Sequence, residues 1–185
     1  MYYVDTNLLV SYVLASDAGH ETSVRELERL AAGGQTIYAS SFTLTEMYNV
    51  LCRKLSRGEE LAEPLRSLIV AYSNRGSSCK FLMSAIMSLL VKKLSVKFVD
   101  YERLYELEPV ALTSPPLKVP KVLRKAMDLS EWIKIRTKDL LHLAYASELA
   151  KIYNIKYFLT SDVEDFKKVK DRVERELQLE IILVA

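Results

Sequence analysis

Four acidic residues stand at positions where a parallel sheet would bring them together. Asp5 follows a short β-prone run, and Glu46 lies in the first turn of a helix after a second strand. Asp139 opens a later helix, and Asp162 follows another strand. Ligands of open parallel sheets bind outside the carboxyl ends of the strands. Crowded carboxylates repel one another unless a cation neutralises them. We therefore predict one pocket in which Asp5, Glu46, Asp139 and Asp162 hold divalent metal.

The kinds of ligand favour Mg²⁺ or Mn²⁺ over zinc. The four candidates offer oxygen only, and the chain has just two histidines and two cysteines. Hard oxygen ligands suit Mg²⁺ and Mn²⁺, which usually share their coordination with a substrate phosphate. A metal-activated water could then attack phosphorus while metal stabilises the leaving oxygen. This chemistry predicts a hydrolytic nuclease.

Helix capping is the competing explanation for these acids. Thr43 and Glu46 have the spacing of a capping box, and Asp139 stands at a helix start where negative charge is favoured. Asp162, with Asp165 three residues on, could cap the next helix. Taken singly, each is at least as well explained by capping. Capping accounts less well for Asp5 and for the gathering of all these acids at one edge of the sheet.

Other active-site chemistries lack their defining residues. The chain has no Gly-rich phosphate loop, which argues against nucleoside triphosphatases and dinucleotide-binding proteins. Nucleophilic catalysis by Ser or Cys needs an organised histidine, and we interpret His142 as a buried, hydrogen-bonded histidine rather than a ligand. Cys52 and Cys79 are too few for a zinc site or a disulfide framework, so we predict two packed thiols.

The elements that must position the acids follow from hydrophobic periodicity and from Gly and Pro. Helices are predicted at residues 7–15, 20–32, 43–57, 62–73, 78–93, 121–135, 139–153 and 163–173, and strands at 2–4, 36–39, 96–99, 156–160 and 181–184. Residues 101–120 contain four prolines and are expected to be irregular. Alternating strands and helices imply crossover connections. The predicted fold is a three-layer α/β/α sandwich with a mainly parallel central sheet.

Size and composition limit the remaining possibilities. The chain has 185 residues, half of them hydrophobic, which predicts one compact domain over residues 1–185. No apolar run approaches the roughly 20 residues of a membrane span, and no signal peptide is evident, so a cytoplasmic location is expected. The formal net charge of +2 does not identify a nucleic-acid binder. Basic groups at residues 53–57, 92–93 and 167–170 could contact RNA phosphates, but solvated helix faces explain each better.

Four segments, in order and at similar spacing, resemble the PIN-domain family. They are Asp-Thr-Asn at 5–7, Thr-Glu at 45–46, Thr-Lys-Asp at 137–139 running into Leu-His-Leu-Ala at 141–144, and Phe-Leu-Thr-Ser-Asp at 158–162 with Asp-Phe at 165–166. The resemblance covers both ends of the chain. Its departure lies at about residues 76–120, where an apolar helix and the Pro-rich stretch predict an insert that compact family members lack.

The resemblance implies a metal-dependent ribonuclease with the acidic quartet Asp5, Glu46, Asp139 and Asp162. Asp165 would be an additional metal-binding residue. Thr6 and Ser161 stand beside ligands and could orient a carboxylate or water, although capping is the better explanation. Many prokaryotic members are VapC-type toxins that an antitoxin holds inactive and that are often dimeric. RNA, an antitoxin protein and a second copy are therefore the implied partners.

The leading hypothesis is an Mg²⁺- or Mn²⁺-dependent endoribonuclease, potentially the toxin of a toxin–antitoxin pair. One alternative is a non-catalytic RNA-binding or assembly module that keeps the acidic pocket as a relic. Another is a housekeeping nuclease of RNA maturation. Binding without metal-dependent cleavage would favour the module. An upstream gene for a small DNA-binding antitoxin would favour the toxin.

Overall fold

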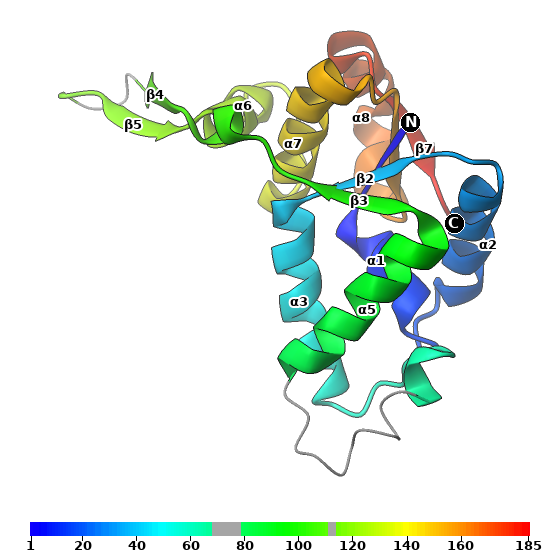
Figure 1. Ribbon diagram of the computed structural model, residues 1–185. Helices are drawn as coiled ribbons and strands as arrows, with labels where there is room; N and C mark the ends of the chain where they lie inside the picture. The colour runs from blue at the N-terminus through cyan, green and yellow to red at the C-terminus, as the bar shows by residue number, and fades with distance from the viewer. Residues whose placement is uncertain (68–78, 111–113) are drawn as a thin grey trace.

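The fold is built around a parallel sheet. The computed structural model describes residues 1–67, 79–110 and 114–185. Within them, five strands form the sheet in the order β3-β2-β1-β6-β7, and every neighbouring pair is parallel (Figure 1). These strands are β1 (Tyr2–Val4), β2 (Ile37–Ser40), β3 (Val96–Val99), β6 (Tyr157–Thr160) and β7 (Glu180–Leu183). This strand order places β1 at the centre of the sheet, and Asp5 directly follows β1.

Helices cover both faces of the sheet, which confirms the predicted three-layer α/β/α sandwich. In Figure 1, α3 and α5 lie on one side of the strands, and α7 and α8 lie on the other. The helices are α1 (Thr6–Val13), α2 (His20–Ala32), α3 (Ser41–Leu55), α5 (Cys79–Leu94), α6 (Lys121–Ser130), α7 (Thr137–Tyr153) and α8 (Val163–Leu177).

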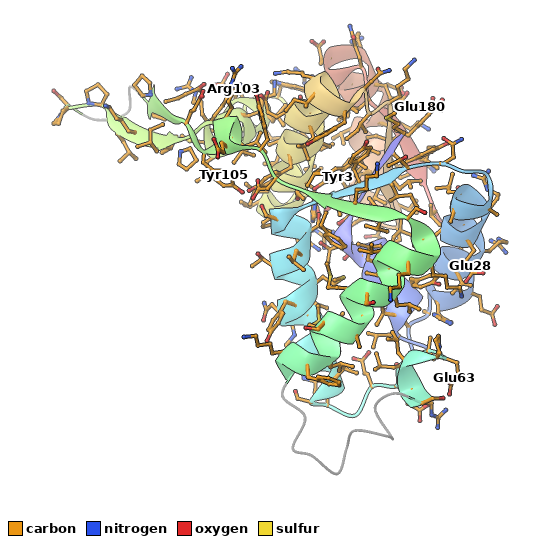
Figure 2. All side chains as sticks on the ribbon, viewed as in Figure 1. Tyr3, Glu28, Glu63, Arg103, Tyr105 and Glu180 are labelled. Carbon is orange, nitrogen blue, oxygen red and sulfur yellow. A yellow bond between two sulfur atoms is a disulfide. The ribbon has the colours of Figure 1, made fainter. Side chains whose placement is uncertain are left out.

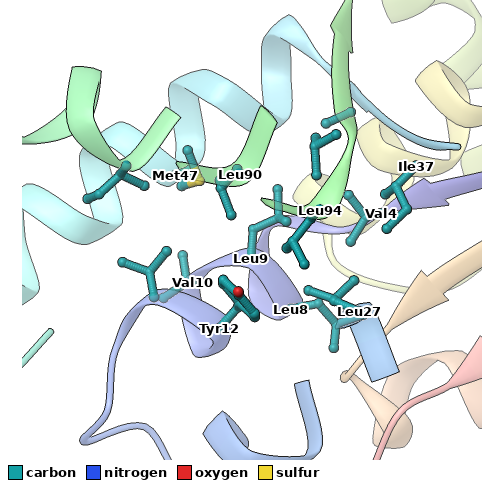
Figure 3. Packing of buried hydrophobic residues seen from close by; sticks show 14 of the residues in the cluster. Val4, Leu8, Leu9, Val10, Tyr12, Leu27, Ile37, Met47, Leu90 and Leu94 are labelled. Atoms are coloured by element: carbon teal, nitrogen blue, oxygen red, sulfur yellow. The ribbon is translucent and has the colours of Figure 1, made fainter. Parts of the chain in front are cut away.

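The two faces of the strands carry two separate hydrophobic cores. Successive strand residues point to opposite faces. Val4 accordingly packs with α1, α2, α3 and α5 (Figure 3), and Leu159 belongs to the same cluster. Tyr3 and Phe158 pack with α6, α7 and α8. Helix α1 is almost wholly buried, which explains its unbroken apolar sequence. A rigid, doubly covered β1 fixes the position of the residue that follows it.

Residues 101–120 are more regular than predicted. They contain a 3₁₀ turn, η2 (Glu102–Tyr105), and the strands β4 (Leu107–Val110) and β5 (Leu117–Pro120), which pair antiparallel apart from the main sheet. Pro109 and Pro120 hide the alternation in the sequence, yet a two-stranded ribbon tolerates proline because each strand has an open edge. Figure 1 shows the ribbon projecting from the body beside α6.

Two further predictions need correction. Helix α6 ends at Ser130 instead of continuing to residue 135, although the apolar Ile133 remains buried and prolongs the helical pattern. Cys52 and Cys79 form a disulfide, with Cα atoms 5.8 Å apart, so the prediction of two packed thiols is wrong. The pairing links α3 to α5 across 27 residues of sequence, which spacing alone does not reveal.

Other boundaries agree with the sequence to within a few residues. Of the predicted helix 62–73, residues 62–64 are not helical, residues 65–67 are helical, and residues 68–73 lie outside the described residues. Of the region at 76–120, α5 and β3 belong to the layers and the sheet, whereas β4 and β5 lie apart. One domain over residues 1–185 with an insert there stays a prediction. In the described part of the chain, no helix is long and apolar enough to span a membrane.

Candidate metal centre

Asp5 sits at the centre of the carboxyl edge of the sheet. Its backbone N–H donates to the Leu159 carbonyl at 2.9 Å, which continues the pairing of β1 with β6. Its side chain is fully buried and does not cap α1. The Thr160 hydroxyl donates to Asp5 Oδ2 at 2.8 Å. Thr160, which sequence reasoning did not select, therefore orients this carboxylate from the neighbouring strand.

Glu46 faces the same pocket from the second turn of α3. The capping box of this helix is formed by Ser40 and Thr43, so the predicted Thr43–Glu46 box is wrong. This leaves the Glu46 carboxylate free to meet His142, whose Nε2 lies 2.9 Å from Glu46 Oε2. Burial raises the pKa of Glu46, but hydrogen bonds from His142 and Thr6 outweigh burial and lower it to about 2. Glu46 is thus held as a carboxylate.

His142 is buried and hydrogen-bonded, as predicted, but it is also part of the site. Its Nδ1 lies 3.1 Å from the Tyr3 hydroxyl, which also contacts Ser40 Oγ at 2.9 Å. We assign the proton to Nε2, because Tyr3 can then donate to Nδ1 while Nε2 donates to Glu46. Tyr3, labelled in Figure 2 at the middle of the molecule, thereby links the β2–α3 turn to α7. The one signal for His142 in the sequence was its position three residues after Asp139, which puts both side chains on the same side of the helix.

Thr6 does not cap the helix it begins. Its hydroxyl lies 3.2 Å from His142 Nε2, so it belongs to the polar contacts of the site. The sequence favoured a helix-capping role for Thr6, and in the structure Thr6 contacts His142 instead. Ser161 is half-buried beside Asp162, and its orienting role stays a prediction.

Asp139 occupies the first turn of α7 and is fully buried. Burial and the negative charge of Asp5 raise its pKa. Its Oδ2 lies 3.0 Å from Nε of Arg136, the residue just before the helix. The helix dipole favours Asp139, and its carboxylate contacts Arg136 and lies 4.0 Å from Lys138 Nζ.

Asp162 and Asp165 complete the acidic edge at the start of α8. Asp162 accepts a hydrogen bond from the Asp165 backbone N–H at 3.3 Å, which confirms its predicted role as the cap of α8. Both carboxylates also form ion pairs with Arg136. Arg136 therefore contacts three acids of this edge, and sequence reasoning did not select it.

The candidate ligands form two groups. Asp5, Glu46 and His142 offer ligand atoms within 4.8 Å of one another, and so do Asp139, Asp162 and Asp165. The five acids named from the sequence thus occur in these groups, divided between them.

Two oxygens supply the test of whether a cation fits. Asp5 Oδ1 and Asp139 Oδ1 are buried and accept no hydrogen bond from any described residue. Asp5 Oδ1 does lie 3.2 Å from His142 Nε2, but the one proton on that nitrogen is directed to Glu46 in our assignment. A buried carboxylate oxygen without a hydrogen bond is costly. A divalent cation bound by hard oxygens would satisfy both, so the residues fit the ion that was predicted.

The basic groups largely behave as ion-paired helix faces. Lys54 pairs with Asp17 and Glu59, and Lys170 pairs with Glu174. Lys138 is closer to the site, with Nζ 3.7 Å from Glu46 Oε1 and 4.0 Å from Asp139 Oδ1. It adds positive charge at the rim of the pocket.

Comparison with known proteins identifies the family of the chain. A family model described as the PIN domain matches residues 2–172, and the chain therefore belongs to the PIN-domain family. A comparison with curated proteins returned no match.

Two solved structures are similar to this chain at low sequence identity, and the first of them shares its fold. VapBC2 from Rickettsia felis, solved with a DNA fragment from its promoter, has a TM-score of 0.52 and 16% identity and covers 100% of this chain and 98% of its own. VapC20 from Mycobacterium tuberculosis, a Sarcin-Ricin loop cleaving toxin, has a TM-score of 0.49 and 13% identity, with 91% and 95% covered.

Proposed function

We propose that this chain is an Mg²⁺- or Mn²⁺-dependent endoribonuclease whose acidic site consists of Asp5, Glu46, Asp139, Asp162 and Asp165. The observation that carries the proposal is the pair of buried oxygens, Asp5 Oδ1 and Asp139 Oδ1, left without a hydrogen bond in an acidic pocket. Membership of the PIN-domain family, whose members are nucleases, supports the same chemistry.

The residues of the chain divide the work. A bound divalent ion would activate water and stabilise the leaving oxygen of a phosphodiester. Thr160 orients Asp5, and His142 orients Glu46. Lys138 and Arg136 offset negative charge where an RNA phosphate must approach the acids. The protein's contribution is to hold carboxylates in place and to lower the repulsion that the substrate meets.

The experiment compares Asp5→Asn and Asp139→Asn with Asp171→Asn, an exposed aspartate of α8. With Mn²⁺ added, wild type and Asp171→Asn should cleave single-stranded RNA, and the two site variants should be at least about 100-fold slower. This follows because removing even a residue behind a ligand typically costs about 10- to 100-fold. The activity readout alone would not separate lost chemistry from lost structure.

Metal-free stability provides the second readout. Each site variant should unfold at a higher temperature than wild type without metal, since it removes one of the repelling charges. Each should also gain less stability from added Mn²⁺. RNA binding by wild type without metal-dependent cleavage would contradict the proposal and favour the non-catalytic module.

We extend the proposal to an antitoxin partner, which the fold likeness to VapBC2 motivates. A small DNA-binding protein encoded immediately upstream should then bind this chain and suppress cleavage. If no such gene exists, the same chemistry would serve a housekeeping nuclease in RNA processing.

A further inference from the structure

Arg136 occupies the centre of one of the two ligand groups. Its Nε lies 3.0 Å from Asp139 Oδ2 and 2.9 Å from Asp165 Oδ2, and its Nη2 pairs with Asp162 Oδ2. The planar guanidinium carries five N–H donors, which suits it to several carboxylates at once. Lys168 also approaches Asp165, but at 3.9 Å and with an exposed side chain. Arg136 is therefore the principal counter-charge of this group.

Asp139 connects this group to the other one. Its Oδ2 is taken by Arg136, whereas its Oδ1 is buried and accepts no hydrogen bond within the described chain. Asp5 Oδ1, in the other group, is likewise buried without a hydrogen bond from the described residues. Lys138 lies between the two groups, with Nζ 3.7 Å from Glu46 Oε1 and 4.0 Å from Asp139 Oδ1. The oxygens without a hydrogen bond are thus not the ones that the guanidinium contacts, whereas the carboxylates of Asp162 and Asp165 are neutralised by it.

From this asymmetry we propose that Arg136 takes the place of a second metal ion. The chain would bind one divalent cation tightly, at the side of Asp5 and Asp139 Oδ1, and Arg136 would exclude another from the group of Asp139, Asp162 and Asp165. A cation bound by this group would lie beside the guanidinium, which contacts one oxygen of each acid, and the two positive charges would repel each other. The inference rests on the proposed metal-dependent function.

A single substitution at Arg136 should be able to relieve the exclusion of the second cation. Its side chain is 53% exposed and it precedes α7, outside the packed core. Removing the guanidinium would leave three carboxylates within 4.8 Å of one another without their main partner. Such a group would gain affinity for a divalent ion, so one substitution should convert a one-ion site into a two-ion site.

The experiment counts Mn²⁺ ions bound to the full chain by titration calorimetry and by electron paramagnetic resonance of free Mn²⁺. Wild type is expected to bind one ion. Arg136→Gln is expected to bind two, with the second at least 10-fold tighter than any second ion in wild type. Arg124→Gln is the matched control, since Arg124 pairs with Asp128 on the exposed side of α6. It should bind one ion, like wild type.

Arg136→Lys keeps the test valid if the Gln variant does not fold. Lysine retains the charge but loses the forked contact, so it should admit a second ion more weakly than Gln does. Two results would overturn the role of Arg136 and leave the proposed metal-dependent function standing. One is that wild type binds two ions tightly. The other is that wild type and the folded Arg136 variants bind the same number of ions with the same affinity. Failure of every protein to bind Mn²⁺ would overturn the proposed function, and this inference with it.

Discussion

The histidine at the centre of the site acts through its neighbours. One ring nitrogen of His142 accepts a hydrogen bond from the Tyr3 hydroxyl, and the other contacts Glu46. The buried Tyr3 thus holds His142 in position, and His142 holds the candidate ligand Glu46. Residues that orient ligands usually matter nearly as much as the ligands themselves. His142 is therefore a positioning residue, and its effect should be separable from simple loss of packing.

At the residue scale, we expect His142→Ala to reduce metal affinity by about 10- to 100-fold. Glu46 loses its main donor, so its pKa should rise from about 2 toward the ordinary value. Because its pKa in the folded wild type is low, Glu46 stays a carboxylate down to low pH. In the variant Glu46 becomes protonated at a higher pH, so the variant should lose metal affinity at a higher pH than wild type does. Calorimetric titrations between pH 4 and 7 would measure this change.

Two further variants control the histidine prediction. His142→Gln retains a donor near the position of Nε2 and should restore part of the affinity. His20→Ala removes the other histidine, which bonds the Ser11 carbonyl away from the acids, and should leave affinity unchanged. Equal pH profiles for wild type and His142→Ala would show that the contact with Glu46 is unimportant.

The sequence identified the acids of the site better than it identified their partners. Asp5, Glu46 and Asp162 follow strand ends, where the geometry of a parallel sheet restricts position. Arginine is common on any surface and threonine on any strand. Thr160 reaches Asp5 only because β6 pairs with β1. Arg136 reaches Asp162 only because the start of α7 lies near the start of α8. Their roles depend on the tertiary structure and left no local pattern.

At the element scale, the junction of α6 and α7 depends on a buried carboxylate. Glu148 of α7 is 5% exposed and pairs with Lys121 of α6 at 3.0 Å and with Lys151. Burial raises the pKa of Glu148, but the two lysines outweigh burial and lower it. A lowered folded pKa means that the unfolded state binds more protons as the solution is acidified.

The contribution of Glu148 to stability should accordingly be present above its unfolded pKa, near 4.5, and should be lost as pH falls through the lower folded pKa. Glu148→Gln should lower the free energy of unfolding by roughly 1–3 kcal/mol at pH 7. The difference should shrink toward pH 3. Urea denaturation of both proteins across this range provides the measurement, and a difference that does not depend on pH would refute it.

Predictions of elements succeeded where periodicity is undisturbed. Helix α2 has the predicted bounds because charged and apolar residues alternate cleanly up to Gly33. The β4–β5 ribbon was missed because its prolines obscure alternation, and the disulfide was missed because only the packing of α3 and α5 brings Cys52 to Cys79. In both instances the information lies in contacts between segments.

At the scale of the whole molecule, the ribbon and α6 present exposed apolar side chains. Leu107 of β4 is 62% exposed and Leu117 of β5 is 54% exposed. Leu123 and Met127, four residues apart on α6, are also exposed, and α6 contacts both strands. Clustered exposed apolar residues mark association surfaces. We propose that a second copy covers this surface.

Substitution of Leu123 and Met127 by Glu should therefore shift the protein from dimer to monomer in sedimentation velocity at micromolar concentration. The reason is that each charge would be buried unpaired at the interface. Val91→Glu on α5, where the wild-type valine is also exposed, should leave the dimer intact. A monomeric wild type under these conditions would remove the basis for the homodimer.

The hydrogen bond from Thr160 to Asp5 joins residues 155 positions apart in the chain. During synthesis on the ribosome, Asp5 emerges early, but its carboxylate has no partner from β6 until residue 160 has left the exit tunnel. Until then β6 cannot pair with β1, and Asp162 and Asp165 have not yet emerged. The complete group of acids can therefore assemble only after nearly the whole chain has left the ribosome.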